Sequence, residues 1–444
     1  MHIVRSSLNT HPLSPFENSE QPKARLSLLG LIAVTFFCVA GGAFGLEDAV
    51  QAAGPQMVLL GILLLPWIWS FPIALMTAEL STAIPENGGY VVWVEKAFGR
   101  FWGFQEGWWS WMGSLADNAL YPVLFLDYLA YLRGDMSALE RWGIGLTLIL
   151  IITFLNIRGI HLVGFISILF MSFIIAPFLI MVIYGAPQMN PIHWLASHEQ
   201  VNWILLLTVL LWNASGWDNV GCCAGEVQKP GTNYPRALAI SVVLVTLIYL
   251  LPLAVGVSAY TDWSHWREGS FPRIGAQIGG PWLGLWLTLA GLISAAGMFN
   301  ALLCTSSRVP YALAKRGMLP DSFARLHSIY GTPWYAILFN ILAVSALIPF
   351  SFRELIELDM FLYAAALILE FCALFQLRLK KPDMPRPYRI PFGMVGVAAL
   401  SLPPICLCFL SIGISNLTTK LAGMAVLIIG IFIYFWSKRS FRFS

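Results

Sequence analysis

Carboxylates inside apolar segments are the side chains of this sequence best suited to chemistry. Glu47 and Asp48 close the stretch 38–48, Cys-Val-Ala-Gly-Gly-Ala-Phe-Gly-Leu-Glu-Asp, in the first apolar run. Asp117 and Asp218 each lie well inside a later apolar run, with no Lys or Arg within a helical turn. A carboxylate at membrane depth costs about 2.5 kcal/mol or more, and a bound cation or a proton would compensate it. The pattern indicates recognition of positive charge.

Each acidic residue also has a plainer interpretation. Asp117 and Asp218 could make polar contacts with a neighbouring helix, and Asn118 could provide the contact in place of Asp117. Glu47 and Asp48 could mark a solvated outer mouth, with only one of them facing a pathway. Between the two sets, Asp218 is the position we most expect to recognise positive charge.

The glycines beside the first acidic pair predict a break in the helix. Gly41, Gly42 and Gly45 share one span with Ala40 and Ala43. Glycine costs roughly 1 kcal/mol relative to alanine inside a helix, so the cluster favours unwinding that exposes backbone groups to a solute. Close packing of small residues is the alternative.

A second interrupted span corresponds to the first. The stretch 211–221, Leu-Trp-Asn-Ala-Ser-Gly-Trp-Asp-Asn-Val-Gly, places Asn213, Ser215 and Asp218 at mid-membrane depth. Paired discontinuous helices at equivalent places in two halves indicate a transporter site, because unwound backbone is tolerated only where it lines a cavity. Trp212 and Trp217 flank this break and could stack on an ammonium group. We favour Trp212 for that role and leave Trp217 open, because most of the 18 tryptophans must serve the membrane interface or packing.

Composition predicts an all-α polytopic membrane protein. The 444 residues are 58% hydrophobic and 11% charged, in apolar runs of about the 20 residues that cross a bilayer. The net charge of +3 is explained by topology, so nucleic-acid binding receives no support. The seven cysteines are scattered without a CxxC or Cys/His spacing, and HExxH, GxSxG and P-loop patterns are absent from the sequence. We expect no metal, no cofactor and no enzyme activity.

Twelve spans are predicted, within few-residue errors at their boundaries: 27–53, 57–83, 101–131, 142–157, 162–185, 201–226, 237–260, 281–313, 333–350, 354–378, 392–413 and 418–437. With the N-terminus inside, 20 of the 26 Lys and Arg residues fall on the cytoplasmic side. This predicts cytoplasmic tails at 1–26 and 438–444 around a permease domain at 27–437. The amphipathic segment 85–99 is expected to lie at the inner interface.

Several stretches resemble the amino acid/polyamine/organocation superfamily, across all twelve spans, and most closely its polyamine-uptake branch. The matching stretches begin at Gly45 (Gly-Leu-Glu-Asp-Ala-Val), Thr77 (Thr-Ala-Glu-Leu-Ser-Thr-Ala-Ile-Pro-Glu-Asn-Gly-Gly-Tyr), Trp102 (Trp-Gly-Phe-Gln-Glu-Gly), Asp117, Ala224 (Ala-Gly-Glu-Val), Arg316, Tyr330 and Lys380 (Lys-Lys-Pro-Asp-Met-Pro-Arg-Pro-Tyr-Arg-Ile-Pro). Residues 214–216 are smaller than that branch would have, so a bacterial branch handling amino acids is the alternative.

The resemblance implies an inverted repeat of five plus five helices (27–185 and 201–378), discontinuous in helices 1 and 6, with two added helices at 392–437. It implies that the substrate is bound by Ala40, Gly41, Gly42, Ala43, Gly45, Asp117, Trp212, Asn213, Ser215 and Asp218. The stretch 294–300, ending at Asn300, would form another wall.

Several other acidic residues fit gating or coupling. Glu79, Glu106 and Glu226 lie toward cytoplasmic span ends, where we expect ion pairs or hydrogen bonds with basic loops. Glu370 lies inside the tenth span, where an interhelical hydrogen bond and proton coupling are equally compatible. The residues expected in gating or coupling are Glu47, Asp48, Glu79, Glu226, Trp217 and Asn300.

The resulting hypothesis is a secondary active transporter of polyamines or cationic amino acids, driven by protons. Its partners would be the small-molecule substrate, protons and the lipid of a plasma (inner) membrane. A neutral or broad-range amino acid permease, or an amino acid/amine exchanger, is the alternative. No expectation about oligomeric state follows.

Overall fold

The computed structural model describes residues 25–134, 136–267, 269–347 and 352–440. Over these ranges the chain is helical apart from its loops and two isolated bridges. Most of the two predicted tails, 1–24 and 441–444, lies outside the described residues.

Every predicted span coincides with helix in the described chain. The first five are α1 (Leu28–Val39) with α2 (Glu47–Ala53), α3 (Pro55–Leu65) continued through η1 (Pro66–Ser70) into α4 (Phe71–Ala83), α6 (Arg100–Arg133), α7 (Ala138–Arg158) and α8 (Ile160–Gly185). The next five are α10 (Trp203–Asn213) with its continuation, α11 (Pro230–Ala259), α13 (Pro281–Ser306), α15 (Trp334–Leu347) and α16 (Phe352–Lys380), and α17 (Gly393–Ile414) and α18 (Leu417–Ser440) follow.

Length and composition identify this as a multi-pass membrane protein. Eight helical stretches of the described chain are long and apolar enough to cross a membrane, and α1, α10 and α15 are shorter apolar helices. The 34-residue α6 is the remaining long helix, and its buried polar side chains include Gln105, Glu106 and Asn118. Its polarity is explained by what it faces, because α6 packs on α13 and α16 in the interior.

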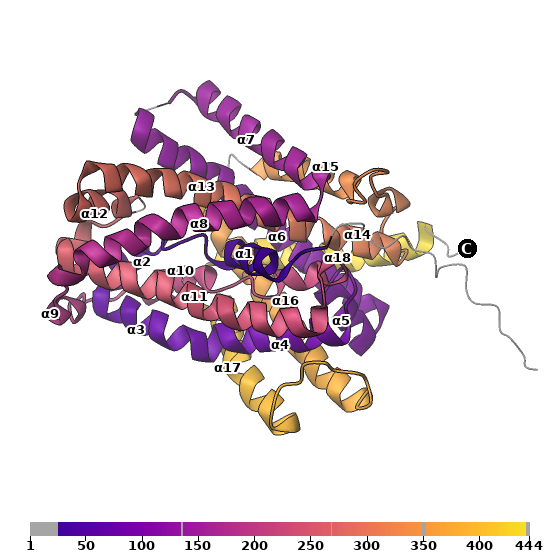
Figure 1. Ribbon diagram of the computed structural model, residues 1–444. Helices are drawn as coiled ribbons and strands as arrows, with labels where there is room; N and C mark the ends of the chain where they lie inside the picture. The colour runs from indigo at the N-terminus through magenta and orange to yellow at the C-terminus, as the bar shows by residue number, and fades with distance from the viewer. Residues whose placement is uncertain (1–24, 135, 268, 348–351, 441–444) are drawn as a thin grey trace, which may run out of the picture.

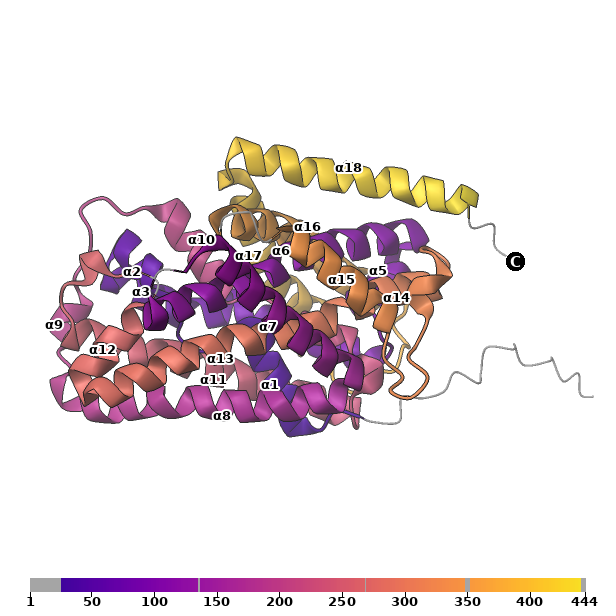
Figure 2. The same ribbon diagram turned by 90° about the horizontal axis from the view of Figure 1, so that it is seen from above.

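The broken first span runs through the middle of the bundle. Figure 1 shows α1 near the centre of the view, and α1 packs on α8, α11 and α13. Figure 2 shows α18 along one outer edge, where it contacts α6 and α16. Helix α18 therefore lies at the periphery of the bundle, away from the broken first span.

The continuation of α10 differs from the expected half-helix. It consists of the short 3₁₀ turns η3 (Asn219–Cys222) and η4 (Ala224–Glu226). The backbone here pairs with another segment: Gly88 N donates to the Cys222 carbonyl at 2.9 Å, and 87 and 223 form an antiparallel bridge. These contacts with the loop after α4 take the place of α-helical hydrogen bonds within the stretch.

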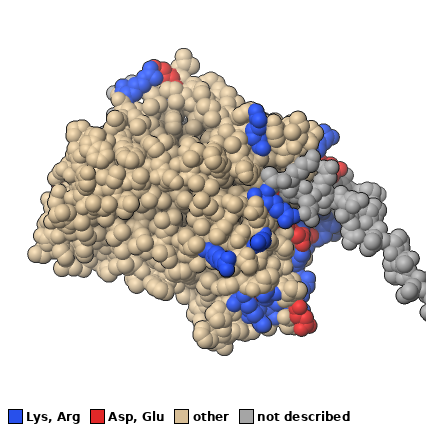
Figure 3. Space-filling view, viewed as in Figure 1, with Lys and Arg blue, Asp and Glu red and all other residues tan. Residues whose placement is uncertain are grey.

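Lys and Arg gather at one end of the molecule in Figure 3, the end where α5 (Tyr90–Phe98) and α14 (Arg308–Lys315) lie in Figure 1. There Arg316 binds Glu95 at 2.5 Å and Glu86 at 3.0 Å. We call this the basic end, defined by Lys96, Arg308, Arg316 and Arg378.

The prediction that segment 85–99 lies at the membrane interface is only partly right. Its helix, α5, packs on α6 and α16, and the side chains of Tyr90 and Trp93 are buried. These aromatics therefore face the protein core, and only the polar side of the segment, with Glu86 and Lys96, reaches the surface.

Candidate functional site

A cavity lies where the two broken spans meet α6, α13 and α16. It holds about 530 Å³ of space not filled by protein atoms, part of which is open to solvent. Its polar wall includes Ser110, Asp117, Tyr121, Ser215, Asp218, Asp359 and Tyr363. We call it the acidic cavity, since three of these residues are carboxylates.

The two broken spans touch each other through Gly216 of the second break and Cys38 at the end of α1. Gly216 has φ +94°, and a Cβ atom there would collide with the Cys38 carbonyl oxygen. Only glycine allows this close approach without strain. The glycine thus brings the backbone of the second break against the end of α1, beside the cavity that Cys38 and Gly216 both line.

Neutral donors hold the cavity carboxylates. Asp117 Oδ1 accepts from the Tyr121 hydroxyl at 2.8 Å and from Trp212 Nε1 at 3.4 Å. Asp218 Oδ1 accepts from the Tyr363 hydroxyl at 2.6 Å. Among the residues that line this cavity there is no Lys, Arg or His. Acidic groups without a protein counter-ion among the lining residues favour binding of a cation.

A second cavity of about 370 Å³ adjoins the acidic one. Trp212 and Met298 line both cavities, so the indole lies at their boundary. The second cavity is mainly apolar and includes Phe44, Leu124 and Tyr128. An aromatic side chain between two cavities is placed to separate them, and a cation in the acidic cavity would lie against its ring.

The first break is partly occupied by the protein's own side chains. Gly45 N donates to Glu47 Oε2 at 2.8 Å, and the Gly45 carbonyl accepts from Asn213 Nδ2 at 3.4 Å. Asn213 also donates to the Val209 carbonyl at 2.9 Å. These bonds connect the two breaks and leave fewer free backbone groups than the glycine cluster led us to expect.

The structure brings only some of the predicted substrate-binding residues together. Asp117, Trp212, Ser215 and Asp218 line the acidic cavity; Ala40, Gly45, Trp212 and Asn213 line the second one. Gly41, Gly42 and Ala43 line neither: Gly41 packs toward Ser294 and Met298, Gly42 packs toward Ile174 and Phe178, and Ala43 is fully buried. A substrate role for any of these residues stays a prediction.

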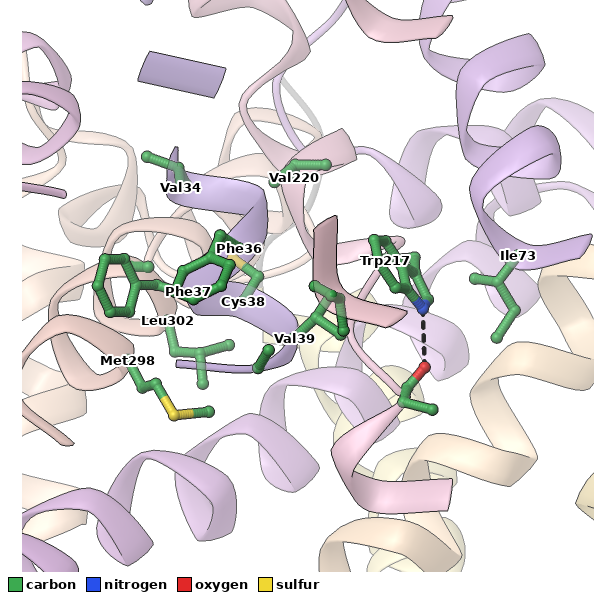
Figure 4. Close-up of a cluster of buried hydrophobic side chains, with 14 of the residues drawn as sticks. Val34, Phe36, Phe37, Cys38, Val39, Ile73, Trp217, Val220, Met298 and Leu302 are labelled. Atoms are coloured by element: carbon green, nitrogen blue, oxygen red, sulfur yellow. Dashed lines mark hydrogen bonds between the residues drawn. The ribbon is translucent and has the colours of Figure 1, made fainter. Parts of the chain in front are cut away.

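Trp217 and Asn300 point away from the acidic cavity. The Trp217 indole is fully buried, donates to the Ala214 carbonyl at 2.7 Å and lies toward Ile73 of α4 in Figure 4. The Asn300 side chain accepts from Asn156 Nδ2 of α7 at 3.0 Å. Both contacts stabilise helix packing, and a gating role for these two residues stays a prediction.

The expected ion pairs at the basic end are present for two of the three glutamates. Arg308 binds Glu226 through Nε at 2.9 Å and Nη2 at 3.0 Å, with both side chains buried. Asn87 Nδ2 also donates to Glu226 at 2.9 Å. These bonds connect the end of the second break to α14 and to the loop after α4, and they close this end of the molecule.

Glu79 makes the other ion pair, with residues around the end of α16. Its carboxylate accepts from Arg378 Nε at 2.6 Å and Nη2 at 2.5 Å, from Ile390 N at 2.8 Å, and pairs with Arg386 at 3.2 Å. Glu106 differs, since no basic group binds it in the described chain: Oε1 accepts from Ser110 Oγ at 2.7 Å and Oε2 has no hydrogen-bond partner. The expected ion pair of Glu106 is therefore wrong.

The acidic residues beside the first break differ in burial. Glu47 is fully buried and Asp48 is half-buried, both in the first turn of α2. Burial contradicts the solvated outer mouth for Glu47, because its carboxylate caps the break through Gly45 N.

Sequence reasoning missed Asp359 and Tyr363 of α16, which complete the acidic cavity. A spacing signal was available: Asp-Asn-Ala-Leu-Tyr from Asp117 and Asp-Met-Phe-Leu-Tyr from Asp359 share the pattern Asp-x-x-x-Tyr. Residues four apart lie on one face of a helix. The same pattern in two membrane helices predicts two acidic faces directed at one place.

These features define a multi-pass helical membrane protein in which two broken helices border an acidic cavity. The chain belongs to the amino acid permease family, whose model matches residues 26–434.

Individual relatives differ in their substrates. A probable polyamine transporter of Arabidopsis thaliana is 42% identical over 428 residues, covering 94% of this chain and 88% of the relative. A polyamine transporter of Oryza sativa subsp. japonica is 41% identical over 432 residues, with 94% and 80% covered. A serine/threonine exchanger of Bacillus subtilis is 26% identical over 435 residues, with 93% and 96% covered.

Proposed function

We propose that this protein is a secondary active transporter that takes up polyamines or cationic amino acids by alternating access, coupled to protons. The observation that carries the proposal is the acidic cavity, where Asp117, Asp218 and Asp359 share one wall with no basic side chain. Relatives named polyamine transporters, at about 42% identity across most of the chain, support the substrate class.

A substrate with several ammonium groups fits this wall best. Each ammonium can donate hydrogen bonds to a carboxylate, and such charge-assisted bonds are the stronger kind. Trp212 can cover the cation through its ring face. An α-amino acid would also bring a carboxylate, which like charge in this cavity disfavours.

The transport cycle rests on the two breaks. The inverted repeat at 27–185 and 201–378 would allow the elements around the breaks to move against the rest and open one end at a time. With the basic end cytoplasmic, the ion pairs of Glu226 and Glu79 form the inner closure, and the protein lies in a plasma (inner) membrane with both termini inside. The predominance of Lys and Arg at that end supports this orientation.

Uptake into proteoliposomes tests the function. Labelled putrescine, spermidine, arginine and serine are each offered with and without an inward proton gradient. We expect accumulation of the amines, increased by the gradient. If none of the first three accumulates, the proposal is wrong.

The serine arm tests the second candidate, an amino acid permease or exchanger. The more distant serine/threonine exchanger of Bacillus subtilis favours this candidate. Serine uptake or exchange that exceeds amine uptake would support it. Thermal-shift measurements with the same solutes provide an independent ranking, because a ligand that binds only the folded state raises apparent stability.

A further inference from the structure

Two buried carboxyl groups lie beside the acidic cavity and outside its wall. Glu106 of α6 is fully buried, and Glu370 of α16 is 1% exposed. Glu106 Oε2 and Glu370 Oε2 have no hydrogen-bond partner within the described chain. We infer that Glu106 and Glu370 form the proton-binding site that couples transport to the proton gradient; this rests on the proposed function.

The surroundings of the pair contain acids and neutral groups. Glu106 and Glu370 interact electrostatically with Asp218 of the second break, and Glu370 also interacts with Glu106. The other titratable groups of the described chain that interact electrostatically with one or both glutamates are Tyr90 of α5, Cys222 of η3, Tyr363 of α16 and Cys408 of α17. Among the other helices that pack on α6, α13 contacts Asn118 through Ser306, α15 contacts Trp111 through Asn340, and α18 contacts Trp108 through the Val426 carbonyl.

Charge balance requires a proton here. An ionised carboxylate without a counter-ion costs several kcal/mol in such a place, whereas a neutral carboxylic acid costs far less. Glu79 and Glu226 avoid this cost through Arg378 and Arg308. For Glu106 and Glu370, no such cation is present among the described residues that surround them, so a proton bound as O–H is the remaining neutraliser.

Further buried polar atoms lie on α4 and α5 without partners among the described residues. Thr77 Oγ1, Ser81 Oγ and Trp93 Nε1 are buried without hydrogen-bond partners in the described chain. A Cβ atom on Gly221 would meet both Ser81 Oγ, at 3.3 Å, and the Trp93 ring. Ser81 and Trp93 therefore lie together beside η3, whose Cys222 interacts electrostatically with both glutamates. Unpartnered buried polar atoms at such a place require an explanation.

The pair is connected to the substrate through Ser110. The Ser110 hydroxyl donates to Glu106 Oε1 at 2.7 Å and itself lines the acidic cavity. A cation bound at Asp218 therefore changes the potential at both glutamates. When the basic end opens, water reaches the pair and a proton leaves one carboxyl, which remains as a carboxylate until the next proton arrives from the other side.

The test uses the full chain in proteoliposomes, with Glu106→Gln and Glu370→Gln. Gln has nearly the shape of a protonated Glu and cannot release a proton. We expect each variant to lose putrescine accumulation driven by the proton gradient by about ten-fold or more, within the usual range of coupling between two sites. Counterflow of putrescine at equal pH, which needs no net proton movement, should stay within about three-fold of wild type by the same coupling argument. A pH-sensitive dye inside the vesicles should report proton entry with substrate for wild type and not for Glu106→Gln or Glu370→Gln.

The matched control is Glu140→Gln, an exposed carboxylate in the first turn of α7 that pairs with Arg133. It should keep both activities. Full gradient-driven accumulation in both test variants would overturn the inference, and so would equal loss of accumulation and counterflow. Failure of both Gln variants to fold would also overturn it, because a carboxyl that is neutral in the folded protein tolerates its neutral isostere. If wild type moves none of the tested amines, the proposed function fails instead.

Discussion

The acidic cavity and the basic end both contain buried carboxyl side chains, but only those at the basic end have a positively charged partner in the described chain. At the basic end, Glu226 and Glu79 each bind an arginine that the chain itself supplies. In the cavity, Asp117 and Asp218 are bound by hydroxyl and indole groups that carry no charge.

The difference shows where the protein itself compensates a buried charge and where a bound cation is needed to do so. A buried ion pair is neutral without help, and it fastens together the segments that contribute to it. A carboxylate held only by neutral donors keeps its orientation but stays available to a cation from outside. The same residue type thus serves closure at one end and recognition in the middle.

Arg308→Met is expected to have the largest effect on stability, because it leaves the Glu226 carboxylate buried without a positive partner. We expect a loss of about 3–5 kcal/mol in the free energy of unfolding, the usual result when one partner of a buried pair is removed. Thermal unfolding of detergent-purified protein measures it. The double variant Glu226→Gln with Arg308→Met should recover much of the loss, and an equal loss in the double variant would contradict the explanation by charge.

Asp218→Asn should affect recognition and leave stability nearly intact. Loss of a charge-assisted hydrogen bond worth about 1.5–3 kcal/mol predicts roughly 10–100-fold weaker putrescine transport. Serine transport should change far less. The control is Asp127→Asn, an exposed carboxylate paired with Arg141. Equal losses for putrescine and serine would assign Asp218 to folding or gating.

Tyr363→Phe tests whether the uncharged hydrogen-bond donors orient the cavity carboxylates for substrate binding. The variant removes the hydroxyl that donates to Asp218 and accepts from Gly216 N at 3.1 Å. Each neutral hydrogen bond is worth about 1 kcal/mol, so we expect roughly a five-fold rise in the putrescine concentration for half-maximal uptake. Tyr121→Phe, which removes the donor to Asp117, is the matched variant. No change in either would mean that the phenols do not orient the carboxylates.

Lys96→Gln should have the smallest effect. Lys96 pairs with Glu86 at 2.6 Å on the surface of the basic end, where solvent screens both charges. Exposed pairs are worth about 0–1 kcal/mol, so stability and uptake should both stay near wild type. A loss as large as that of Arg308→Met would contradict the distinction between the buried and the surface pairs.

Much of the fold follows from local properties of the sequence. Apolar runs located a helix at each of the twelve predicted positions, eight of them in stretches long and apolar enough to cross a membrane. Glycines, joined by polar residues in the second case, located both interruptions, because each is a signal carried by neighbouring residues. The 3₁₀ course of residues 219–226 was missed because the loop after α4, more than 130 residues earlier, supplies its hydrogen bonds.

The site was predicted less completely for the same reason. Asp117, Trp212 and Asp218 stood out as polar or aromatic residues beside breaks or within apolar runs. Asp359 lies near Glu354 and Glu357 at the start of α16, so its burial could not be separated from theirs without the packing of α6 on α16. Likewise, the sequence left a solvated mouth and a pathway position open for Glu47, and its burial and its bond to Gly45 show that it turns inward.

The Asp-x-x-x-Tyr faces of α6 and α16 carry a final consequence. The two helices run in opposite directions, since α6 starts at the basic end and α16 finishes there. Each therefore offers an acid and a phenol to the same space in reversed order. A solute with identical ends, such as a linear diamine, presents the same ammonium group to each of these acids whichever end enters first. Such degeneracy doubles the number of productive encounters and is worth about 0.4 kcal/mol of affinity, which a solute with unlike ends does not gain.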